Sequence, residues 1–287
     1  MRPDPAATFE TERPRLLRLA YRMLGSHAEA EDAVQDAYLR WHGTMETGAE
    51  IASAPAWLTR TVSRLCLDRM KSARSRRETY PGTWLPEPLI EAEDDALRPD
   101  NLTLSLMLAL ERLSPLERAA FLLHDVFGQP LDEVAETVGR SPAATRQLAS
   151  RARAHVRLDQ PRYEIPRETG DEIARAFFAA CSTGDATALG AMLAESATLR
   201  SDGGGKVLSY PNVIEGAPNL VRLFLGLHRK FGEAMEFLEA TVIDGLPGFV
   251  ARFDGHLQTT ALEIVGGRIV AIYVTRNPDK LAGVLRH

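Results

Sequence analysis

Two helices and the tight turn between them are encoded in Leu131-Asp-Glu-Val-Ala-Glu-Thr-Val-Gly139-Arg140-Ser141-Pro142, within a chain of 287 residues. Apolar residues recur at helical spacing up to Val138, which predicts a helix with one buried face. Gly139 ends that helix, because glycine adopts a left-handed backbone without strain. Ser141 can cap the next helix and Pro142 suits its first turn. We therefore expect a helix-turn-helix within residues 114–157.

The second helix of this motif has a basic face. Residues 140–157 contain five arginines and no acidic residue, although the whole chain has a net charge of −5. The spacing places Thr145, Ala149, Ala152 and Val156 inward and leaves the arginines outside. In a helix-turn-helix the second helix lies in the DNA major groove, where Arg and Gln can bind guanine and adenine edges. The pattern favours DNA binding over a solvated helical hairpin.

Charge is separated along the chain. Residues 57–77 hold seven Lys or Arg and one Asp, whereas residues 86–100 hold six acids and one Arg. Phosphates respond to the local basic patch, because screening limits electrostatic reach to about 10 Å. Net acidity therefore does not exclude nucleic acid as a partner.

Bulk composition is that of a globular protein, with 45% apolar and 25% charged residues. No apolar run reaches the ~18 residues of a membrane span, and Met1-Arg-Pro-Asp-Pro lacks the apolar core of a signal peptide. We expect a cytoplasmic protein with no membrane partner. Cys66 and Cys181 lack metal-type spacing and are expected to be buried or partly buried thiols. The seven histidines form no cluster, so we expect no metal and no cofactor.

Four segments are expected. Helices at 8–24, from about 27 to 42, and from about 55 to 77 form a first all-helical domain, residues 1–79. A proline-rich, acidic linker follows at 80–101, because its prolines exclude helix interiors. Its apolar Trp84-Leu-Pro-Glu-Pro-Leu89 is expected to dock on a protein surface. The helix-turn-helix domain spans 102–160, and a last domain spans 161–287.

The last domain changes character to α+β. Helices are expected at Asp171–Cys181 and 185–194, followed by strands with glycine-containing hairpin turns. The layout predicts a curved antiparallel sheet behind leading helices. The expected strands are Ala197–Arg200, Lys206–Tyr210, Met235–Asp244, Phe249–Phe253, Leu257–Val265 and Ile269–Thr275.

The order of parts resembles a known family. Ala20-Tyr-Arg-Met-Leu-Gly, the acidic Glu31–Asp36 segment, Trp41 and Trp57-Leu58 resemble region 2 of bacterial extracytoplasmic-function sigma factors. Residues 114–157 resemble region 4 of that family, and the C-terminal third resembles the cone-shaped SnoaL-like fold. Three strings resemble the sigma subgroup with this fused domain: Trp84-Leu-Pro-Glu-Pro-Leu89, Asp202-Gly-Gly-Gly-Lys206 and Asn277-Pro-Asp-Lys-Leu281. The resemblance implies two all-α sigma domains followed by an α+β domain.

The resemblance implies a promoter-specificity subunit of RNA polymerase that is not an enzyme. The second helix of region 2 would bind the β′ clamp of the core polymerase, and region 4 would bind the β flap. The residues implied for the clamp contact are Glu31, Asp32, Gln35 and Asp36. A solvated acidic face is the alternative for these four residues.

Two basic surfaces would bind promoter DNA. The −10 element would lie on the basic helix 57–77, because holding a melted strand requires cations along its phosphates; loop 43–53 would supply a base pocket. The implied −10 residues are Arg60, Arg64, Arg69, Lys71, Arg74, Arg76 and Arg77. The implied −35 residues are Arg146, Gln147, Ser150 and Arg151 for bases, with Arg140, Arg153 and Arg157 for phosphates. Leu148, Ala143 and Ala144 are expected at exposed positions, where a thymine methyl could be contacted.

The resemblance to the subgroup with the fused domain implies that this domain and its tail regulate sigma activity in cis, in place of a separate anti-sigma protein. We expect three strings to lie together at one interdomain surface that regulates the sigma regions. Their residues are Trp84, Leu85, Pro86, Glu87, Pro88, Leu89, Asp202, Gly203, Gly204, Gly205, Lys206, Asn277, Pro278, Asp279, Lys280 and Leu281.

Catalysis in the C-terminal domain is not expected. Asp202, His228, Asp254, His256 and Tyr273 are general-base candidates by type, but no spacing among them requires chemistry. The glycine triplet lacks the spacing of a phosphate-binding loop. Two rivals to the sigma-factor hypothesis remain: a one-component helix-turn-helix regulator with a ligand-binding C-terminal domain, and an isomerase-like enzyme tethered to DNA. An unknown small ligand of the C-terminal domain is compatible with the main hypothesis.

Overall fold

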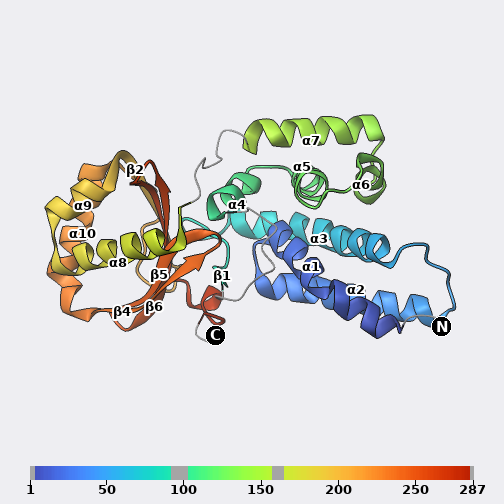
Figure 1. Ribbon diagram of the computed structural model, residues 1–287, viewed down its shortest axis with the longest axis horizontal. Coiled ribbons are helices and arrows are strands. Elements are labelled where there is room, and N and C mark those ends of the chain that lie inside the picture. Colours follow the sequence, from blue (N-terminus) through green and yellow to red (C-terminus); the bar gives the residue numbers. More distant parts are fainter. Residues whose placement is uncertain (1–3, 92–102, 157–164, 285–287) are drawn as a thin grey trace. The chain divides into compact units, whose positions relative to one another are not determined.

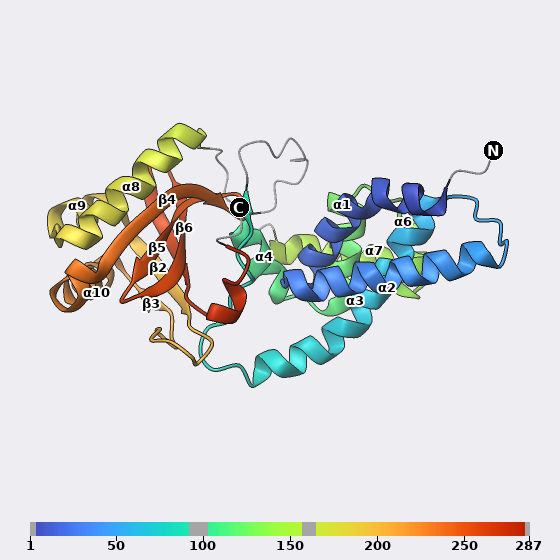
Figure 2. The same ribbon diagram turned by 90° about the horizontal axis from the view of Figure 1, so that it is seen from below.

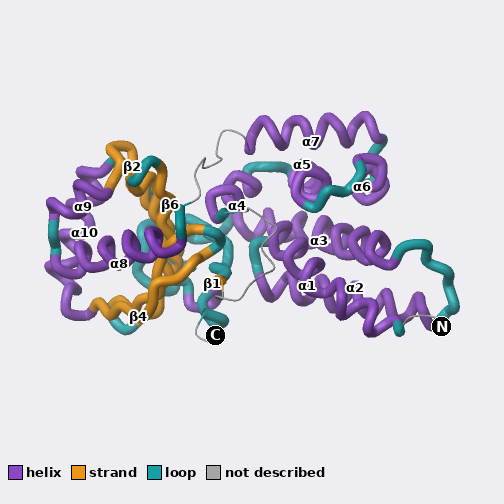
Figure 3. The backbone as a smooth tube through the Cα atoms, viewed as in Figure 1, coloured by secondary structure: helices purple, strands orange, loops and turns teal. Residues whose placement is uncertain are grey.

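A computed structural model describes residues 4–91, 103–156 and 165–284; for residues 71–78, Glu91 and Glu233 it describes the backbone alone. The chain forms two compact units. The first consists of Met1–Thr79 and Ala109–Asp159, and the second of Tyr80–Leu108 and Gln160–His287. Helices make up the first unit, whereas the second combines helices with a sheet (Figure 3).

Three helices open the first unit and lie side by side (Figure 1): α1 (Pro5–Leu24), α2 (His27–Glu46) and α3 (Ala54–Glu78). Gly25 ends α1 in a left-handed conformation with φ of 70°, as its lack of a Cβ permits. Ser26 then caps α2 by accepting a hydrogen bond from the Glu29 amide. The three expected helices are confirmed, and none of the described helices is long and apolar enough to span a membrane.

The helix-turn-helix is confirmed. It comprises α6 (Leu131–Val138) and α7 (Pro142–Val156), with Gly139 at φ of 66° and the Ser141 hydroxyl accepting from the Ala144 amide. Ahead of them lie α4 (Leu104–Glu111), α5 (Pro115–Phe121) and the π-helical turn η1 (Leu122–Val126).

One expectation about α7 is wrong. Leu148 is buried, not exposed, because it lies three residues after Thr145 and four before Ala152 on the inward stripe. The remaining inward residues were assigned correctly, since Thr145, Ala149, Ala152 and Val156 are all buried. Leu148 is therefore a packing residue, and a thymine contact by it is excluded.

A buried arginine joins the two helical parts of the first unit. Arg118 on α5 is 2% exposed, and its guanidinium donates to the backbone oxygens of Met23 and Leu110. The Glu111 carboxylate neutralises its charge at 2.6 Å. Because a buried cation requires such pairing, this contact fixes α5 against the end of α1.

The second unit holds a strongly curved sheet with helices packed on it (Figure 2). The strand order is β1-β4-β5-β6-β7-β2-β3. All neighbouring strands are antiparallel except β2 and β7, so the sheet is mixed, not purely antiparallel. The strands are β1 (Ile90–Glu91), β2 (Leu193–Asp202), β3 (Ile214–Glu215), β4 (Met235–Ile243), β5 (Leu246–Phe253), β6 (His256–Val265) and β7 (Arg268–Thr275).

Three helices cover this sheet: α8 (Arg167–Thr183), α9 (Ala186–Met192) and α10 (Ala217–Phe231). Two were expected, but α10 was not. The strand expected at Lys206–Tyr210 is wrong, since these residues form a turn and a loop after β2. The short helical turns η2 (Gly232–Ala234) and η3 (Pro278–Lys280) complete the described elements.

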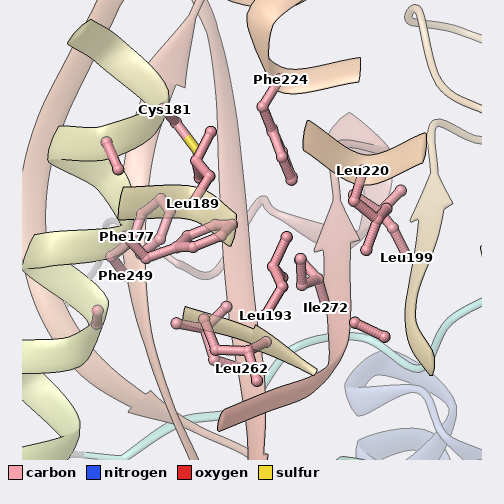
Figure 4. Close-up of a cluster of buried hydrophobic side chains, with 14 of the residues drawn as sticks. Phe177, Cys181, Leu189, Leu193, Leu199, Leu220, Phe224, Phe249, Leu262 and Ile272 are labelled. Carbon is pink, nitrogen blue, oxygen red and sulfur yellow. The ribbon is translucent and has the colours of Figure 1, made fainter. Parts of the chain in front are cut away.

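Side chains from α8, α10 and the sheet form one apolar core (Figure 4). Phe177 and Phe224 meet edge to face at 5.3 Å between ring centroids, a favoured aromatic geometry. Cys181 lies in this core, and Cys66 is buried in the first unit, so both are buried thiols as expected. Burial raises the pKa of Cys66 to about 12, which makes its thiol unreactive at neutral pH.

Candidate functional site

The outer face of α7 carries the residues expected to bind bases. Arg146, Gln147 and Ser150 are exposed together on this face. Arg151 is 61% exposed and pairs with Glu117 at 3.0 Å. Burial raises the pKa of Glu117, but hydrogen bonds from Ser114 and the nearby Arg151 lower it more, so its net pKa lies below the ordinary value. Glu117 is thus ionised at neutral pH and orients Arg151.

The arginines expected to bind −35 phosphates differ in how exposed their side chains are. Arg140 is exposed and donates to the carbonyl of Gly139. Arg153 is partly buried and paired with Asp125. Arg157 lies outside the described residues.

Two of the expected −10 residues bind the helix-turn-helix in this structure. Arg60 on α3 pairs with Glu136 on α6 at 2.5 Å. Arg64 donates to the backbone oxygen of Glu136 at 2.8 Å and to that of Thr137 at 3.4 Å. These guanidiniums therefore hold α6 on α3, and either could bind phosphates only after this packing loosened.

A third expected −10 residue, Arg69, lies at the acidic face of α2. It pairs with Asp36 at 2.7 Å and Asp32 at 3.6 Å, and it donates to the Glu29 carbonyl. Glu31, Asp32 and Gln35 are exposed, and Asp36 is half-buried. Arg69 thus orients part of the surface expected to bind polymerase. The side chains of Lys71, Arg74, Arg76 and Arg77 lie outside the described residues.

Trp57 and Trp41 pack together, with ring centroids 5.5 Å apart. The Trp41 indole also donates to the Pro5 carbonyl at 2.9 Å. Trp41 is buried and Trp57 is partly buried, so both rings support the junction of α1, α2 and α3.

In the second unit, the three strings singled out in the sequence come together around one buried carboxylate. Asp202 is 0% exposed. Its Oδ1 accepts from the Tyr80 hydroxyl at 2.6 Å and the Gly204 amide at 3.0 Å. Its Oδ2 accepts from the Leu85 amide at 2.9 Å and from Lys280 Nζ at 2.7 Å. We name Tyr80, Leu85, Asp202, Asn277 and Lys280 the Asp202 cluster.

Lys280 supplies the positive charge of this cluster. Its ammonium also donates to the Leu85 carbonyl and lies 4.4 Å from the centroid of the Trp84 ring. Asn277 donates its side-chain amide to the Tyr80 hydroxyl at 2.8 Å. Burial and the hydrogen bond to Asp202 raise the pKa of Tyr80, which keeps its hydroxyl a donor. A buried charge pair this well bonded holds the linker to the C-terminal domain.

The glycine triplet lets neighbouring chain segments pack closely against the backbone beside Asp202. Gly204 and Gly205 have φ of 63° and 70°, where side chains are strained. A Cβ on Gly204 would collide with Asn277, and one on Gly205 would lie 2.8 Å from Pro81. The glycine string is also joined to the string Asn277–Leu281 by an ion pair, because Lys206 pairs with Asp279 on η3.

Asp244 provides a second attachment for the linker, which the sequence analysis missed. Its amide donates to the Leu89 carbonyl at 2.9 Å, and its carboxylate accepts from the Leu89 amide at 3.2 Å. Ile90 then pairs with Ile243 as the edge strand β1. Leu85 is fully buried with Leu246. The expected docking of the linker is confirmed by these contacts.

The docked linker is largely buried. Pro86 and Pro88 are buried, Glu87 is partly buried, and Leu281 packs in a small core with Val250. Pro278 and Asp279 are exposed in η3. The three strings therefore form one continuous attachment within the second unit.

The general-base candidates do not converge. Asp202 is fully bonded, His228 contacts the Ser182 carbonyl, and Tyr273 donates to Glu263. Asp254 and His256 are exposed at the β5–β6 turn. Among the residues described, no group of three or more His, Cys, Asp or Glu side chains could hold a metal ion.

Two family models match the helical parts of the chain: Sigma-70 region 2 over residues 8–76, and Sigma-70, region 4 over residues 103–156. The chain is 38% identical to the ECF RNA polymerase sigma factor SigJ of Mycobacterium tuberculosis (strain ATCC 25618 / H37Rv), over 96% of this chain and 92% of SigJ. The chain belongs to the ECF RNA polymerase sigma factors.

Two further comparisons agree with this assignment. This sigma factor is 32% identical to the probable ECF RNA polymerase sigma factor SigI of Mycobacterium tuberculosis (strain CDC 1551 / Oshkosh), over 97% of this chain and 95% of SigI. The crystal structure of Mycobacterium tuberculosis SigJ matches it with a TM-score of 0.78 at 34% identity, covering 97% of this chain and 98% of that one. The C-terminal domain of this sigma factor is thus part of the shared fold.

Proposed function

We propose that this sigma factor directs core RNA polymerase to promoters through two separate contacts of its first unit. The observation that supports this proposal is a pair of exposed surfaces on sigma regions 2 and 4, namely the acidic face of α2 and the outer face of α7. Glu31, Asp32 and Gln35 would contact basic groups on the β′ clamp. Region 4 would contact the β flap. These contacts would place the protein in the cytoplasm, with the polymerase.

Promoter recognition would use α7 and α3. On α7, Arg146, Gln147 and Ser150 have the side-chain chemistry for base edges in the major groove. On α3, Arg60 and Arg64 would bind −10 phosphates after leaving α6. Arg69 would act indirectly, by orienting Asp36 and Asp32 for the polymerase contact.

The attached linker would regulate sigma activity in cis. Residues 80–91 join region 2 to region 4 along the chain, and the Asp202 cluster and Asp244 hold this segment on the C-terminal domain. Release or retention of the segment would change the distance that the two sigma regions can span. A separate anti-sigma protein would then not be required, and no catalytic role is proposed for the C-terminal domain.

The experiment mixes the full chain with core polymerase and a promoter fragment and follows complexes by size-exclusion chromatography. The account predicts that the chain coelutes with core enzyme and that promoter DNA joins the complex only when both proteins are present. A one-component regulator would bind its DNA alone and would not need core enzyme, so that pattern would overturn the proposal.

The polymerase contact is tested with Glu31→Arg. Glu31 is exposed on the acidic face of α2, so its replacement leaves the Arg69 pairs intact. The matched control is Glu10→Arg on α1, which is exposed outside that face. Coelution with core enzyme should weaken for the first variant and persist for the second.

A further inference from the structure

Asp244, in the turn between β4 and β5, binds the chain at two places that lie far apart in the sequence. Its amide donates to the Leu89 carbonyl at 2.9 Å, and its carboxylate accepts from the Leu89 amide at 3.2 Å. Its carbonyl accepts at 2.9 Å from the amide of Leu104, the residue at which α4 begins. One residue therefore binds both ends of the fourteen-residue stretch 90–103.

The burial of Asp244 distinguishes it from the aspartate of a second turn in the same sheet. Asp244-Gly245 and Asp254-Gly255 are both two-residue hairpin turns, with the aspartate at φ of 46° and 52°. Asp254 is exposed, whereas Asp244 is 0% exposed. A buried carboxylate is costly unless hydrogen bonds stabilise it. Because Asp254 forms the same turn in the open, the burial of Asp244 indicates a role beyond the turn.

Apolar packing reinforces the attachment at Leu104. Leu104 and Leu108 lie four residues apart on one side of α4 and pack in the same core as Leu246 of the sheet. The second unit includes α4 up to Leu108, whereas the helix continues at Ala109 in the first unit. The match to sigma region 4 begins at residue 103. Since so short a helix is marginal by itself, we infer that the start of region 4 depends on the C-terminal domain.

We propose that Asp244 is a clasp that limits the distance the two sigma regions can span, and thereby sets the promoter spacing that the protein accepts. While both ends are bound to Asp244, residues 90–103 add no length between the regions. Once released, they add up to about 46 Å of extended chain, at about 3.3 Å per residue. One extra base pair separates two promoter elements by only about 3.4 Å. The proposal rests on the proposed function, because it requires regions 2 and 4 to bind the two elements.

The clasp itself is tested by amide hydrogen exchange on the full chain without polymerase. Asp244→Gly removes the buried carboxylate and keeps the turn, because glycine adopts a positive φ without strain. Exchange at the Leu89 and Leu104 amides should accelerate about tenfold, the effect of losing a hydrogen bond to a charged group. Asp254→Gly makes the same substitution in the exposed turn and should leave both amides unchanged. Equal exchange in the two variants would overturn the clasp.

Promoter spacing is tested by run-off transcription with core polymerase on templates of optimal spacing and on templates two base pairs longer or shorter. The ratio of transcript at altered spacing to transcript at optimal spacing should rise severalfold in Asp244→Gly, up to the about tenfold increase in clasp opening. It should not change in Asp254→Gly. A general loss of stability would lower transcription from all templates and leave this ratio unchanged, so equal ratios would contradict the role of Asp244.

The two measurements separate this proposal from the proposed function. If the unsubstituted chain gives no transcript from any template, the proposed function fails. The exchange rates of the free chain would still decide whether Asp244 holds both ends of the stretch 90–103.

A second variant covers the case in which Asp244→Gly does not fold. Leu108→Lys keeps a good helix former on α4 but places a charge against the apolar side of the sheet. It should accelerate exchange at Leu104 and raise the spacing ratio in the same direction. Leu208→Lys is the matched control, because Leu208 is 57% exposed in the same unit. Unchanged exchange and unchanged spacing preference in Leu108→Lys would show that the C-terminal domain does not restrain region 4.

Discussion

At the scale of single residues, Asp202 shows why a buried carboxylate can hold two chain segments together. Its side chain accepts four hydrogen bonds, two from the linker and two from the C-terminal domain, and Lys280 supplies the opposite charge. Removing one partner of such a pair leaves the other charge buried and unpaired, which costs far more than the pair's net contribution. Asp202 is therefore expected to dominate the stability of the linker attachment.

We predict that Asp202→Asn lowers the free energy of unfolding of the C-terminal unit by about 3 kcal/mol, the scale of a broken buried ion pair. The loss arises because Lys280 keeps its charge without a counterion. Denaturant unfolding followed by circular dichroism measures the change. Asp254→Asn is the control, since Asp254 is exposed in a turn with φ of 52° that Asn also adopts. Equal stability of both variants would contradict the role of Asp202.

A second prediction concerns Arg146 on the outer face of α7. Arg146→Ala should weaken binding to a specific promoter by the polymerase–sigma complex about tenfold and relax the base preference at one −35 position. Arg140→Ala should weaken binding less and equally for all sequences, as expected for a phosphate contact. Competition binding with single-base promoter variants separates the two effects. A sequence-independent loss for Arg146→Ala would refute base contact.

At the scale of elements, the packing of α6 on α3 joins the two surfaces proposed to bind DNA. Arg60 and Arg64 contact α6 and cannot at the same time follow a DNA strand. The exposed Arg60–Glu136 pair contributes at most about 1 kcal/mol to this packing, and the hydrogen bonds of Arg64 add to it. If Arg60 and Arg64 bind promoter phosphates as proposed, the packing of α6 on α3 would restrain promoter binding.

Glu136→Arg tests this restraint. Replacing the acid by a cation should repel Arg60, loosen α6 and raise promoter binding at limiting protein by up to about fivefold, the equivalent of 1 kcal/mol. Added positive charge alone could also favour DNA, so Glu133→Arg, an exposed position on the same helix, serves as control. The account fails here if both variants give the same increase.

The linker is the second element with a testable attachment. Gly205→Val should loosen residues 80–91, because the new side chain meets Pro81 and the backbone is already at φ of 70°. Gly255→Val introduces comparable strain at φ of 75° with nothing within 4 Å of the new Cβ. Chymotrypsin should cleave near Trp84 several-fold faster in the first variant than in the second. Identical cleavage rates would show that the triplet does not hold the linker.

The elements also show how far sequence reasoning reaches. Local signals were sufficient for the helix-turn-helix, where Gly139, Ser141 and Pro142 act through their own backbone preferences. The helix α10 was missed although Leu220, Phe224 and Leu227 are spaced for one buried face. The parallel pairing of β2 with β7 depends on contacts between residues far apart in the chain, which no local pattern encodes.

Side-chain partners were predicted less well than elements. Arg60, Arg64 and Arg69 were grouped as one DNA surface because they share a helix and a charge. The structure divides them between α6 and the acidic face of α2, since an arginine pairs with whichever carboxylate or carbonyl the fold brings close. In contrast, the three strings around Asp202 lie together as expected, but within the second unit. That their surface regulates the sigma regions stays a prediction.

At the scale of the whole molecule, the chain combines two sigma regions with a domain that holds the segment between them. The helical unit carries the surfaces proposed for polymerase and promoter, and the C-terminal unit carries the linker attachment. Promoter recognition and its control would therefore reside in one polypeptide.

The most direct measurement is run-off transcription with purified core polymerase, the full chain and a library of candidate promoter fragments. The account predicts transcripts with defined start sites that appear only when core enzyme and this chain are both present, and that are lost with Glu31→Arg. A failure of the folded chain to start any specific transcript on the library, under salt conditions where it coelutes with core enzyme, would contradict the account.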